Sequence, residues 1–283
     1  MKVTVSELNF YPIKSCKGTA VESIKVGLRG LEHDRQWMLV RDGGLALTQR
    51  DFASMALIDV QMIESDDVWF KLSAPGAPEF HLLKCPEKGR GFVQVRVWDD
   101  ACQAVDQGDA VAQWFTDYLG ASSRLVQMTP DFVRAVDERY AVSPGDQVNF
   151  QDGYPLLLIS EASLDDLNSQ LPERLPMNRF RPNLVVSGCE PFAEDSWDVI
   201  EINGVRFSVV KPCDRCVVTT IDQKAATRGV EPLRALAGYR SVNNKVMFGQ
   251  NLIHHNHGEL TRGSELTVVS KKSAPDPLLT KAK

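Results

Sequence analysis

The sequence predicts a mainly β protein with a few helices, an α+β fold divided into two β-rich units. Short apolar segments, several of them alternating with polar residues, are separated by glycine and proline in both halves of the chain. Asn203-Gly204 stands between two such segments, and this dipeptide strongly favours a two-residue hairpin turn. Only two segments show the apolar spacing of a helix.

The composition is that of a globular protein without a nucleic-acid or membrane partner. Of the 283 residues 43% are hydrophobic and 24% charged, which excludes a disordered or fibrous chain. The net charge of −5 provides no global basic field for nucleic acid. No apolar segment approaches the about 20 residues of a membrane span, and the N-terminus lacks the apolar stretch of a signal peptide. We therefore expect a cytoplasmic protein whose six cysteines are mostly free thiols.

The first unit is predicted to be a barrel or a strongly curved sheet, because many short strands joined by turns favour that architecture. Residues 109–119 then predict a helix that Asp109 caps and Gly120 ends. A domain boundary near this helix gives units 1–120 and 121–270, followed by a flexible tail at 271–283. The strands of the first unit are expected at residues 2–11, 20–26, 37–40, 55–63, 68–72 and 92–98.

The second unit is also β-rich. Residues 129–150 are polar and turn-rich and predict either an ordered loop or a mobile flap. A helix is expected from Ser160 to Leu171, because Leu164, Leu167 and Leu171 fall on one face and a proline follows. Strands are expected at residues 155–159, 183–187, 197–202, 205–210, 216–221, 246–248, 252–253 and 266–269.

The segment Lys211-Pro-Cys-Asp-Arg-Cys216 is the sharpest chemical feature of the sequence. A thiolate binds soft metals, and neighbouring cations such as Lys211 and Arg215 favour the thiolate form. A redox disulfide usually stands at a helix N-terminus, whereas Cys216 leads into a β-branched stretch. A zinc site needs a second ligand pair. Residue types alone therefore leave metal or redox chemistry and a pair of packed, inert thiols equally open.

Several basic residues fall where they could bind an anion. In an extended chain Arg179 and Arg181 point to the same face, and arginine suits bidentate contacts with oxyanions. Arg179 is expected at the surface, whereas a site role and a surface position are equally open for Arg181. Lys14 and Ser15 lie in a predicted turn, which can present an ammonium, a hydroxyl and backbone N–H groups. Arg35 stands near the start of a strand, and each of these signals is weak by itself.

The order of the motifs resembles that of MOSC-domain proteins. The resemblance extends over residues 3–269 and is closest to members with an N-terminal β-barrel domain, a group that includes the mitochondrial amidoxime-reducing component. It implies an N-terminal β-barrel-like domain packed on a C-terminal MOSC β-barrel domain. The motifs are Tyr11-Pro-Ile-Lys-Ser-Cys-Lys-Gly18, Asp34-Arg35 followed by Trp37-Met-Leu-Val40, Ile159-Ser-Glu-Ala-Ser-Leu-Asp-Asp-Leu-Asn168, Arg179-Phe-Arg-Pro-Asn-Leu-Val-Val186, Pro212-Cys-Asp-Arg-Cys216 with Thr219-Thr220, and Phe248-Gly-Gln250.

The resemblance also implies a molybdenum cofactor (molybdopterin) and the residues that hold it. In that family the second cysteine of the Cys-x-Arg-Cys stretch ligates molybdenum, so Cys216 is the expected metal ligand and catalytic residue. Lysine and arginine suit a phosphate, and Ser and Asn side chains can both donate and accept. The pterin and its phosphate are expected to bind Lys14, Ser15, Arg35, Ser160, Arg181, Asn183, Arg215, Gln250 and Asn251.

The resemblance implies an oxidoreductase that reduces, and so detoxifies, N-hydroxylated compounds such as hydroxylamino bases and amidoximes. No cysteine follows Cys216, so the iron–sulfur domain of some bacterial relatives is not expected and a separate ferredoxin-like protein or flavoprotein would supply electrons. The targeting segment of the mitochondrial relatives is not expected either. Asn251 replaces an aromatic residue of those relatives, which leaves the shape of the substrate open. The alternatives are a sulfur or molybdenum-cofactor carrier that uses Cys216, and a binding protein whose fold holds no cofactor.

Overall fold

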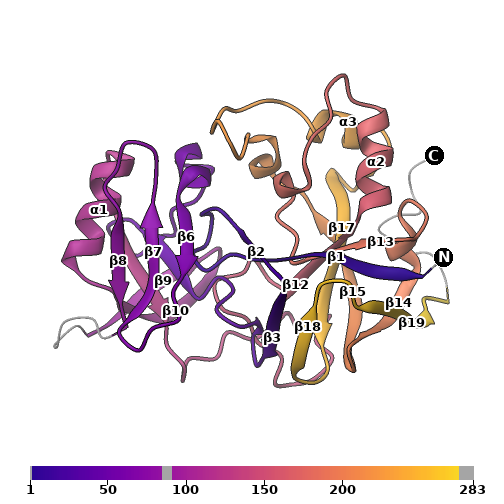
Figure 1. The fold of residues 1–283 in the computed structure, drawn as a ribbon, viewed down its shortest axis with the longest axis horizontal. Coiled ribbons are helices and arrows are strands. Elements are labelled where there is room, and N and C mark those ends of the chain that lie inside the picture. Colours follow the sequence, from indigo (N-terminus) through magenta and orange to yellow (C-terminus); the bar gives the residue numbers. More distant parts are fainter. Residues whose placement is uncertain (1, 85–90, 274–283) are drawn as a thin grey trace.

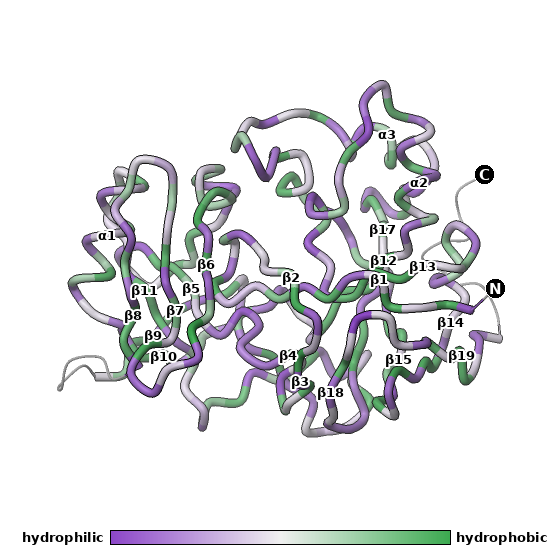
Figure 2. The backbone as a smooth tube through the Cα atoms, in the orientation of Figure 1, coloured by the Kyte–Doolittle hydropathy of each residue, from purple (hydrophilic) through white to green (hydrophobic). Residues whose placement is uncertain are grey.

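The computed structural model describes residues 2–84 and 91–273, which form two lobes side by side (Figure 1). The mainly β fold is confirmed: the described residues form a closed seven-stranded β-barrel, a half-barrel and three α-helices. Hydrophobic and hydrophilic segments alternate along the chain in both lobes (Figure 2). None of the helices in the described part of the chain is long and apolar enough to cross a membrane.

The closed barrel fills the lobe formed mainly by the second half of the chain. Pairing of β12 with β17 closes it, and all its neighbouring strands are antiparallel except β12 and β13. The first strand of the chain, β1, belongs to this barrel because it pairs with both β13 and β19. In order around the barrel the strands are β12 (Leu156–Ser160), β13 (Leu184–Ser187), β1 (Val3–Phe10), β19 (Glu265–Lys271), β14 (Trp197–Ile202), β15 (Val205–Asp214) and β17 (Lys245–His254).

The other lobe contains two smaller antiparallel sheets and the helix α1 (Asp109–Leu119), which lies on its outer side in Figure 1. Helix α1 buries Phe115 in a cluster with Trp37 and Phe70, whose rings meet edge to face at 5.1 Å. Fully burying one such side chain contributes about 1.5–3 kcal/mol. One sheet holds β5 (Trp37–Val40), β11 (Arg124–Met128), β10 (Asp100–Asp106) and β9 (Phe92–Val97), and the other holds β6 (Asp59–Met62), β7 (Val68–Ser73) and β8 (Phe80–Leu83).

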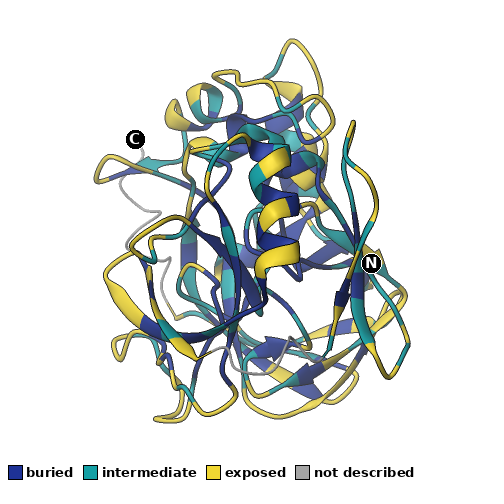
Figure 3. Ribbon diagram, turned by 90° about the vertical axis from the view of Figure 1, so that its left-hand side faces the viewer, coloured by how far each residue is buried: buried dark blue, intermediate teal, exposed yellow. Residues whose placement is uncertain are grey.

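Shorter elements complete both lobes, and exposed residues concentrate in the loops around the buried strands (Figure 3). The shorter elements are the strands β2 (Thr19–Val21), β3 (Ser23–Gly27), β4 (Gly30–Leu31), β16 (Ser241–Val242) and β18 (Gly258–Thr261), the helices α2 (Glu161–Ser169) and α3 (Leu233–Ala237), and the 3-10 helices η1 (Ala53–Leu57), η2 (Met177–Arg179), η3 (Ala193–Ser196) and η4 (Val217–Thr220).

The two predicted helices and the predicted hairpin are confirmed. Helix α1 has the predicted bounds and ends at Gly120 in the left-handed conformation. Its cap differs, because Gly108 is the N-cap and the carboxylate of Asp109 pairs with Arg124 at 2.9 Å. Helix α2 begins after Ser160 as predicted but ends at Ser169. The β14–β15 hairpin turns at Asn203-Gly204, both with positive φ as a type I′ turn requires.

The prediction of a strand at residues 216–221 is wrong. Val217–Thr220 form the 3-10 helix η4, and Cys216 directly precedes it. The hydroxyls of Thr219 and Thr220 donate to the carbonyls of Cys216 and Val217 at 3.0 and 2.8 Å. Such local side-chain bonds compete with a sheet ladder and outweigh the β propensity of these residues.

Other strand predictions need smaller corrections. Residues 55–63 divide into η1 and β6, and residues 20–26 divide between β2 and β3. The segments predicted at 246–248 and 252–253 are one strand, β17, because Gly249 takes a positive φ that lets pairing continue past the interruption. Part of the predicted tail, 274–283, lies outside the described residues, and Lys271 still belongs to β19.

The segment 129–150 is an ordered loop in this structure, one of its two predicted states. Arg29 donates to the carbonyls of Pro130 and Phe132 at 2.8 and 2.5 Å. The buried Arg134 donates to the carbonyls of Asn149 and Gln151 at 2.9 and 2.5 Å. These bonds fix the loop beside the junction of the two lobes.

Candidate cofactor site

A cavity of about 550 Å³ lies between the two lobes, a volume typical of sites for small ligands. Seven of its lining residues are lysine or arginine and three are aspartate. The lining is therefore cationic although the whole chain is acidic. The charged residues are Lys14, Arg35, Arg50, Arg179, Arg181, Lys211, Arg215, Asp99, Asp152 and Asp214, and the uncharged ones used below are Ser15, Trp98, Tyr154, Asn183, Cys213, Cys216 and Asn251.

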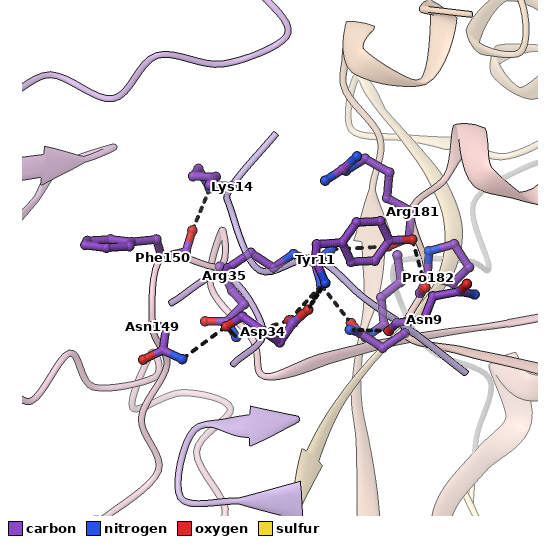
Figure 4. A network of polar contacts seen from close by, with 12 residues as sticks. Asn9, Tyr11, Lys14, Asp34, Arg35, Asn149, Phe150, Arg181 and Pro182 are labelled. Carbon is purple, nitrogen blue, oxygen red and sulfur yellow. Dashed lines mark hydrogen bonds and ion pairs between the residues drawn. The ribbon is translucent and has the colours of Figure 1, made fainter. Parts of the chain in front are cut away.

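Two arginines of this cavity stack on the ring of Tyr11 (Figure 4), with guanidinium carbons 4.0 Å (Arg35) and 4.2 Å (Arg181) from its centroid. The Tyr11 hydroxyl donates to the carbonyl of Pro182 at 3.0 Å, so the ring is fixed between the lobes. Arg35 pairs with the fully buried Asp34 at 2.7 Å. Tyr11 thus holds two like charges close together, and only one of them has a carboxylate partner among the described residues.

Arg181 is the cation without that partner. It is 9% exposed, and neither of its terminal nitrogens has a hydrogen-bond partner in the part of the chain that the structure describes. Burial, and to a lesser extent the charge of Arg35, lower the pKa of Arg181 to about 10, so it stays charged at neutral pH. A buried charged donor without an acceptor is costly, and an anion in the cavity would remove that cost.

Three of the predicted cofactor-binding residues have left-handed backbones. The φ angles of Ser15, Arg35 and Arg181 are 68°, 45° and 55°. This region is unfavourable for residues other than glycine and is found disproportionately at ligand sites. All three residues line the cavity, so their unusual backbone conformation coincides with the candidate site.

Lys14 is buried and already bonded within the protein. Its Nζ donates to the carbonyl of Phe150 at 2.8 Å (Figure 4) and to Asp152 Oδ1 at 2.6 Å. Burial lowers the pKa of Lys14, and the charge of Asp152 partly offsets that shift. The Asp152 side chain is 70% exposed, so an anion reaching Lys14 would compete with a carboxylate that is largely solvated.

The two thiols of the Cys-x-x-Cys segment differ. Cys216 is exposed, whereas Cys213 is only half-exposed. Arg215 Nη1 lies 3.0 Å from Cys213 Sγ and Nη2 donates to the carbonyl of Phe180 at 2.5 Å. Burial raises the pKa of the Cys213 thiol, and Arg215 opposes that shift. Arg215 therefore contacts Cys213 and not Cys216. Cys216 is the more exposed of the two cavity thiols and hence the one more accessible to a ligand.

The cavity brings together most, but not all, of the predicted site residues. Lys14, Ser15, Arg35, Arg181, Asn183, Arg215, Cys216 and Asn251 line it, whereas Ser160 and Gln250 are absent from its lining. Both of those side chains are fully buried and bonded elsewhere: Ser160 Oγ accepts from the backbone N–H of Ser163 at 3.1 Å, and Gln250 donates to Asp195 at 2.6 Å. Gln250 and Asn251 are adjacent in β17, so their side chains take opposite faces and only Asn251 reaches the cavity.

Asn183 lines the cavity, but its side-chain amide holds the lobes together. Its Oδ1 accepts from the Leu157 N–H and from Arg35, each at 3.2 Å. Its Nδ2 donates to the carbonyl of Asn9 at 3.1 Å. The Asn183 side chain therefore bonds β1 and β12 to each other within the barrel and holds Arg35 beside them.

The expectation that Arg179 is a surface residue is wrong. Arg179 is 8% exposed, pairs with Asp222 at 2.8 Å and lines the cavity. The sequence argument assumed an extended chain, whereas Met177–Arg179 form the 3-10 helix η2. Lys211, part of the predicted Lys-Pro-Cys-Asp-Arg-Cys motif, also lines the cavity. Arg50, Trp98 and Asp152 line it too, but no local sequence pattern marks these three because tertiary contacts alone bring them there.

The described part of the chain holds no cluster of conventional metal ligands. Across residues 2–84 and 91–273, no three His, Cys, Asp or Glu side chains are grouped so that they could hold a metal ion. Each cavity thiol is therefore considered by itself, and Cys216 is the accessible one.

Comparison with known proteins gives a consistent result over nearly the whole chain. The model for the MOSC N-terminal beta barrel domain matches residues 2–122, and the model for the MOSC domain matches residues 145–267. The mitochondrial amidoxime reducing component 2 of Bos taurus is 37% identical over 84% of this chain and 72% of its own length. The mitochondrial amidoxime-reducing component 1 of Homo sapiens is 34% identical over 95% and 83%. The molybdenum cofactor sulfurase of Danio rerio is 32% identical over 93% of this chain but only 34% of its own length.

Proposed function

The chain belongs to the MOSC family, in the group with an N-terminal MOSC β-barrel domain, and from that premise we propose a molybdenum-cofactor-dependent oxidoreductase. Its proposed substrates are N-hydroxylated compounds, amidoximes and hydroxylamino bases among them. The observation that carries the proposal is one cavity that holds both an exposed thiol, Cys216, and a buried arginine, Arg181, without an acceptor among the described residues. Two of the relatives are named for amidoxime reduction.

The residues present fit an anionic cofactor that carries a soft metal. The free terminal nitrogens of Arg181 are donors suited to phosphate oxygens. Lys14 and Ser15 lie on the same cavity and add an ammonium and a hydroxyl. The Cys216 thiol is the accessible soft ligand. The donors come from both lobes, so one cofactor would be held between them.

Each group has a separate task in the proposed reaction. Cys216 would hold the metal of the cofactor, and Arg181 and Lys14 would hold its anionic group. When bound, the cofactor supplies the redox chemistry: an N–OH group takes up two electrons and two protons, the N–O bond breaks, and an N–H group and water leave. A separate electron-transfer protein would provide the electrons.

A carrier of sulfur or of the cofactor is the second candidate. Its supporting observation is the similarity of 93% of this chain to part of a molybdenum cofactor sulfurase, together with the exposure of Cys216. In this role the Cys216 thiolate would take the outer sulfur of a donor persulfide, with the donor thiol as leaving group, and would then pass that sulfur to an acceptor nucleophile while Cys216 leaves as the thiolate.

Reductase activity separates the two candidates. Protein from a host that makes the cofactor is supplied with a chemical electron donor and benzamidoxime, and benzamidine formation is measured for wild type, Cys216→Ser and Cys213→Ser. We expect turnover in wild type and in Cys213→Ser and none in Cys216→Ser. No turnover in any sample, with a Cys216-dependent persulfide detected by mass spectrometry, would instead support the carrier.

A further inference from the structure

The tip of the β9–β10 hairpin carries a tryptophan in an unfavourable backbone conformation. Val97 pairs with Asp100, so Trp98 and Asp99 form a two-residue turn. Trp98 has a φ of 55°, a conformation that glycine, asparagine or aspartate normally adopts in such turns. In a bulky residue it is a genuine outlier, and outliers of this kind concentrate where a ligand is held.

The indole is also unusually exposed for its size. Trp98 is 53% exposed although large aromatic residues are normally mostly buried. Its surroundings are the cavity that also contains Cys216 and Arg181, and not a flat outer face of the lobe. Folding therefore places a half-exposed indole in the same cavity as Cys216.

Two contacts hold the ring in a defined orientation. Trp98 Nε1 donates to Asp152 Oδ1 at 3.1 Å, and Asp152 is bonded to Lys14 at 2.6 Å. The guanidinium carbon of Arg50 lies 4.3 Å from the indole centroid. Arg50 covers one face and Asp152 takes the Nε1 edge, so the exposed part of the residue is the remaining face and edge. This is a preorganised stacking surface that faces a ligand cavity.

We propose that Trp98 is a specificity-determining residue that stacks on the planar ring of the substrate, so that the site favours aryl and heteroaromatic N-hydroxylated compounds over aliphatic ones. An exposed indole can stack on many different planar rings, since every planar base or arene has a π-face. The inference rests on the proposed reductase function. In this proposal Trp98, a residue of the N-terminal lobe, sets the preference for aromatic over aliphatic substrates. The cofactor-binding residues alone would not set that preference.

A matched pair of substrates tests the proposal in the cofactor-loaded protein. KM and kcat are measured for benzamidoxime and acetamidoxime, which share the reacting group and differ in the ring. We expect Trp98→Ala to raise the KM of benzamidoxime about tenfold, to change that of acetamidoxime less than twofold, and to leave kcat of both nearly unchanged. Trp98→Phe should keep most of the preference. An equal rise for both substrates, or no change for either, overturns the proposal.

A second variant separates selectivity from folding. Asparagine tolerates the left-handed conformation, so Trp98→Asn should keep or raise the Tm while losing the preference for the ring. A fall in Tm with the preference intact would mark Trp98 as a packing residue. If wild type reduces neither compound, the proposed reductase function fails, and saturation-transfer NMR of benzamidoxime with wild type and Trp98→Ala still decides the stacking: an equal signal in both proteins contradicts it.

Discussion

Two parts of the cavity wall are built in opposite ways. The buried part consists of Arg35, Arg181 and Asn183. The two arginines stack on the buried ring of Tyr11, and Asn183 accepts from Arg35 at 3.2 Å. The open part consists of Trp98, Arg50 and Asp152, which present a half-exposed ring and a solvated carboxylate. Buried donors suit a cofactor that stays bound, and an open aromatic surface suits a substrate that exchanges. One cavity can therefore divide these two tasks between a buried and an open part of its wall.

Within the buried part, Arg35 and Arg181 should respond oppositely to substitution. Arg35→Met leaves the fully buried Asp34 without its cation, and breaking a buried pair costs about 3–5 kcal/mol of unfolding free energy. Urea unfolding of the cofactor-free protein measures this loss. Arg41→Met, an exposed position, is the control and should stay within about 0.5 kcal/mol of wild type. A loss in Arg35→Met no larger than in the control would contradict the pairing.

Arg181→Met should weaken cofactor binding without weakening the fold. It removes a buried charge that lacks an acceptor among the described residues, so the cofactor-free protein should be as stable as wild type or more so. A lost hydrogen bond to a charged group costs about 1.5–3 kcal/mol, which predicts cofactor affinity lower by about ten- to a hundredfold. Molybdenum retained after dialysis measures this, with the exposed Arg206→Met as control. Unchanged retention would contradict the role of Arg181.

One reciprocal amide pair, Gln49 with Gln223, contributes to the junction between the lobes. Gln49 Nε2 donates to Gln223 Oε1 at 3.1 Å and to the carbonyl of Ser15 at 2.8 Å, and Gln223 Nε2 donates to Gln49 Oε1 at 2.9 Å. Either single change to leucine leaves the buried Oε1 of the other glutamine without its donor, which costs about 1–3 kcal/mol, whereas the Nε2 groups keep their bonds to the carbonyls of Ser15 and Ile221. The double Leu variant should lose less than the sum of the singles. A double-mutant cycle checks this, and strictly additive losses would show that the pair is not coupled.

Ser160 gives the smallest expected effect and the sharpest contrast with the cavity residues. Its Oγ caps α2, and removing an N-cap hydroxyl costs about 1 kcal/mol. Ser160→Ala should therefore lower stability by that amount while molybdenum content stays at the wild-type level. Lost molybdenum with unchanged stability would restore the cofactor-binding role that the family resemblance implies for this residue.

Features encoded by neighbouring residues could be predicted from the sequence. The spacing of Val111, Trp114 and Phe115 predicted α1 with its bounds, and Asn203-Gly204 predicted the β14–β15 hairpin. The family motifs located Lys14, Arg181 and Cys216, which share one cavity.

Features that depend on tertiary contacts or on side-chain direction could not be predicted in this way. The pairing of β1 with β13 joins residues about 180 positions apart (Thr4 with Ser187), and no local pattern encodes such a partner. Motif membership placed Ser160 and Gln250 with the cofactor residues, but cap geometry and strand alternation turn both side chains away. Trp98 was missed because its importance comes from a backbone conformation and from Arg50 and Asp152, which lie far along the chain.

The central claim is that Cys216 and the cationic cavity hold a molybdenum cofactor, and metal analysis tests it most directly. Molybdenum and pterin are measured in wild type, Cys216→Ser and Cys213→Ser, each purified from a host that makes the cofactor. We predict near-stoichiometric molybdenum in wild type and in Cys213→Ser and its loss in Cys216→Ser. Absence of molybdenum from all three proteins, or its full retention in Cys216→Ser, would show that Cys216 does not hold such a cofactor.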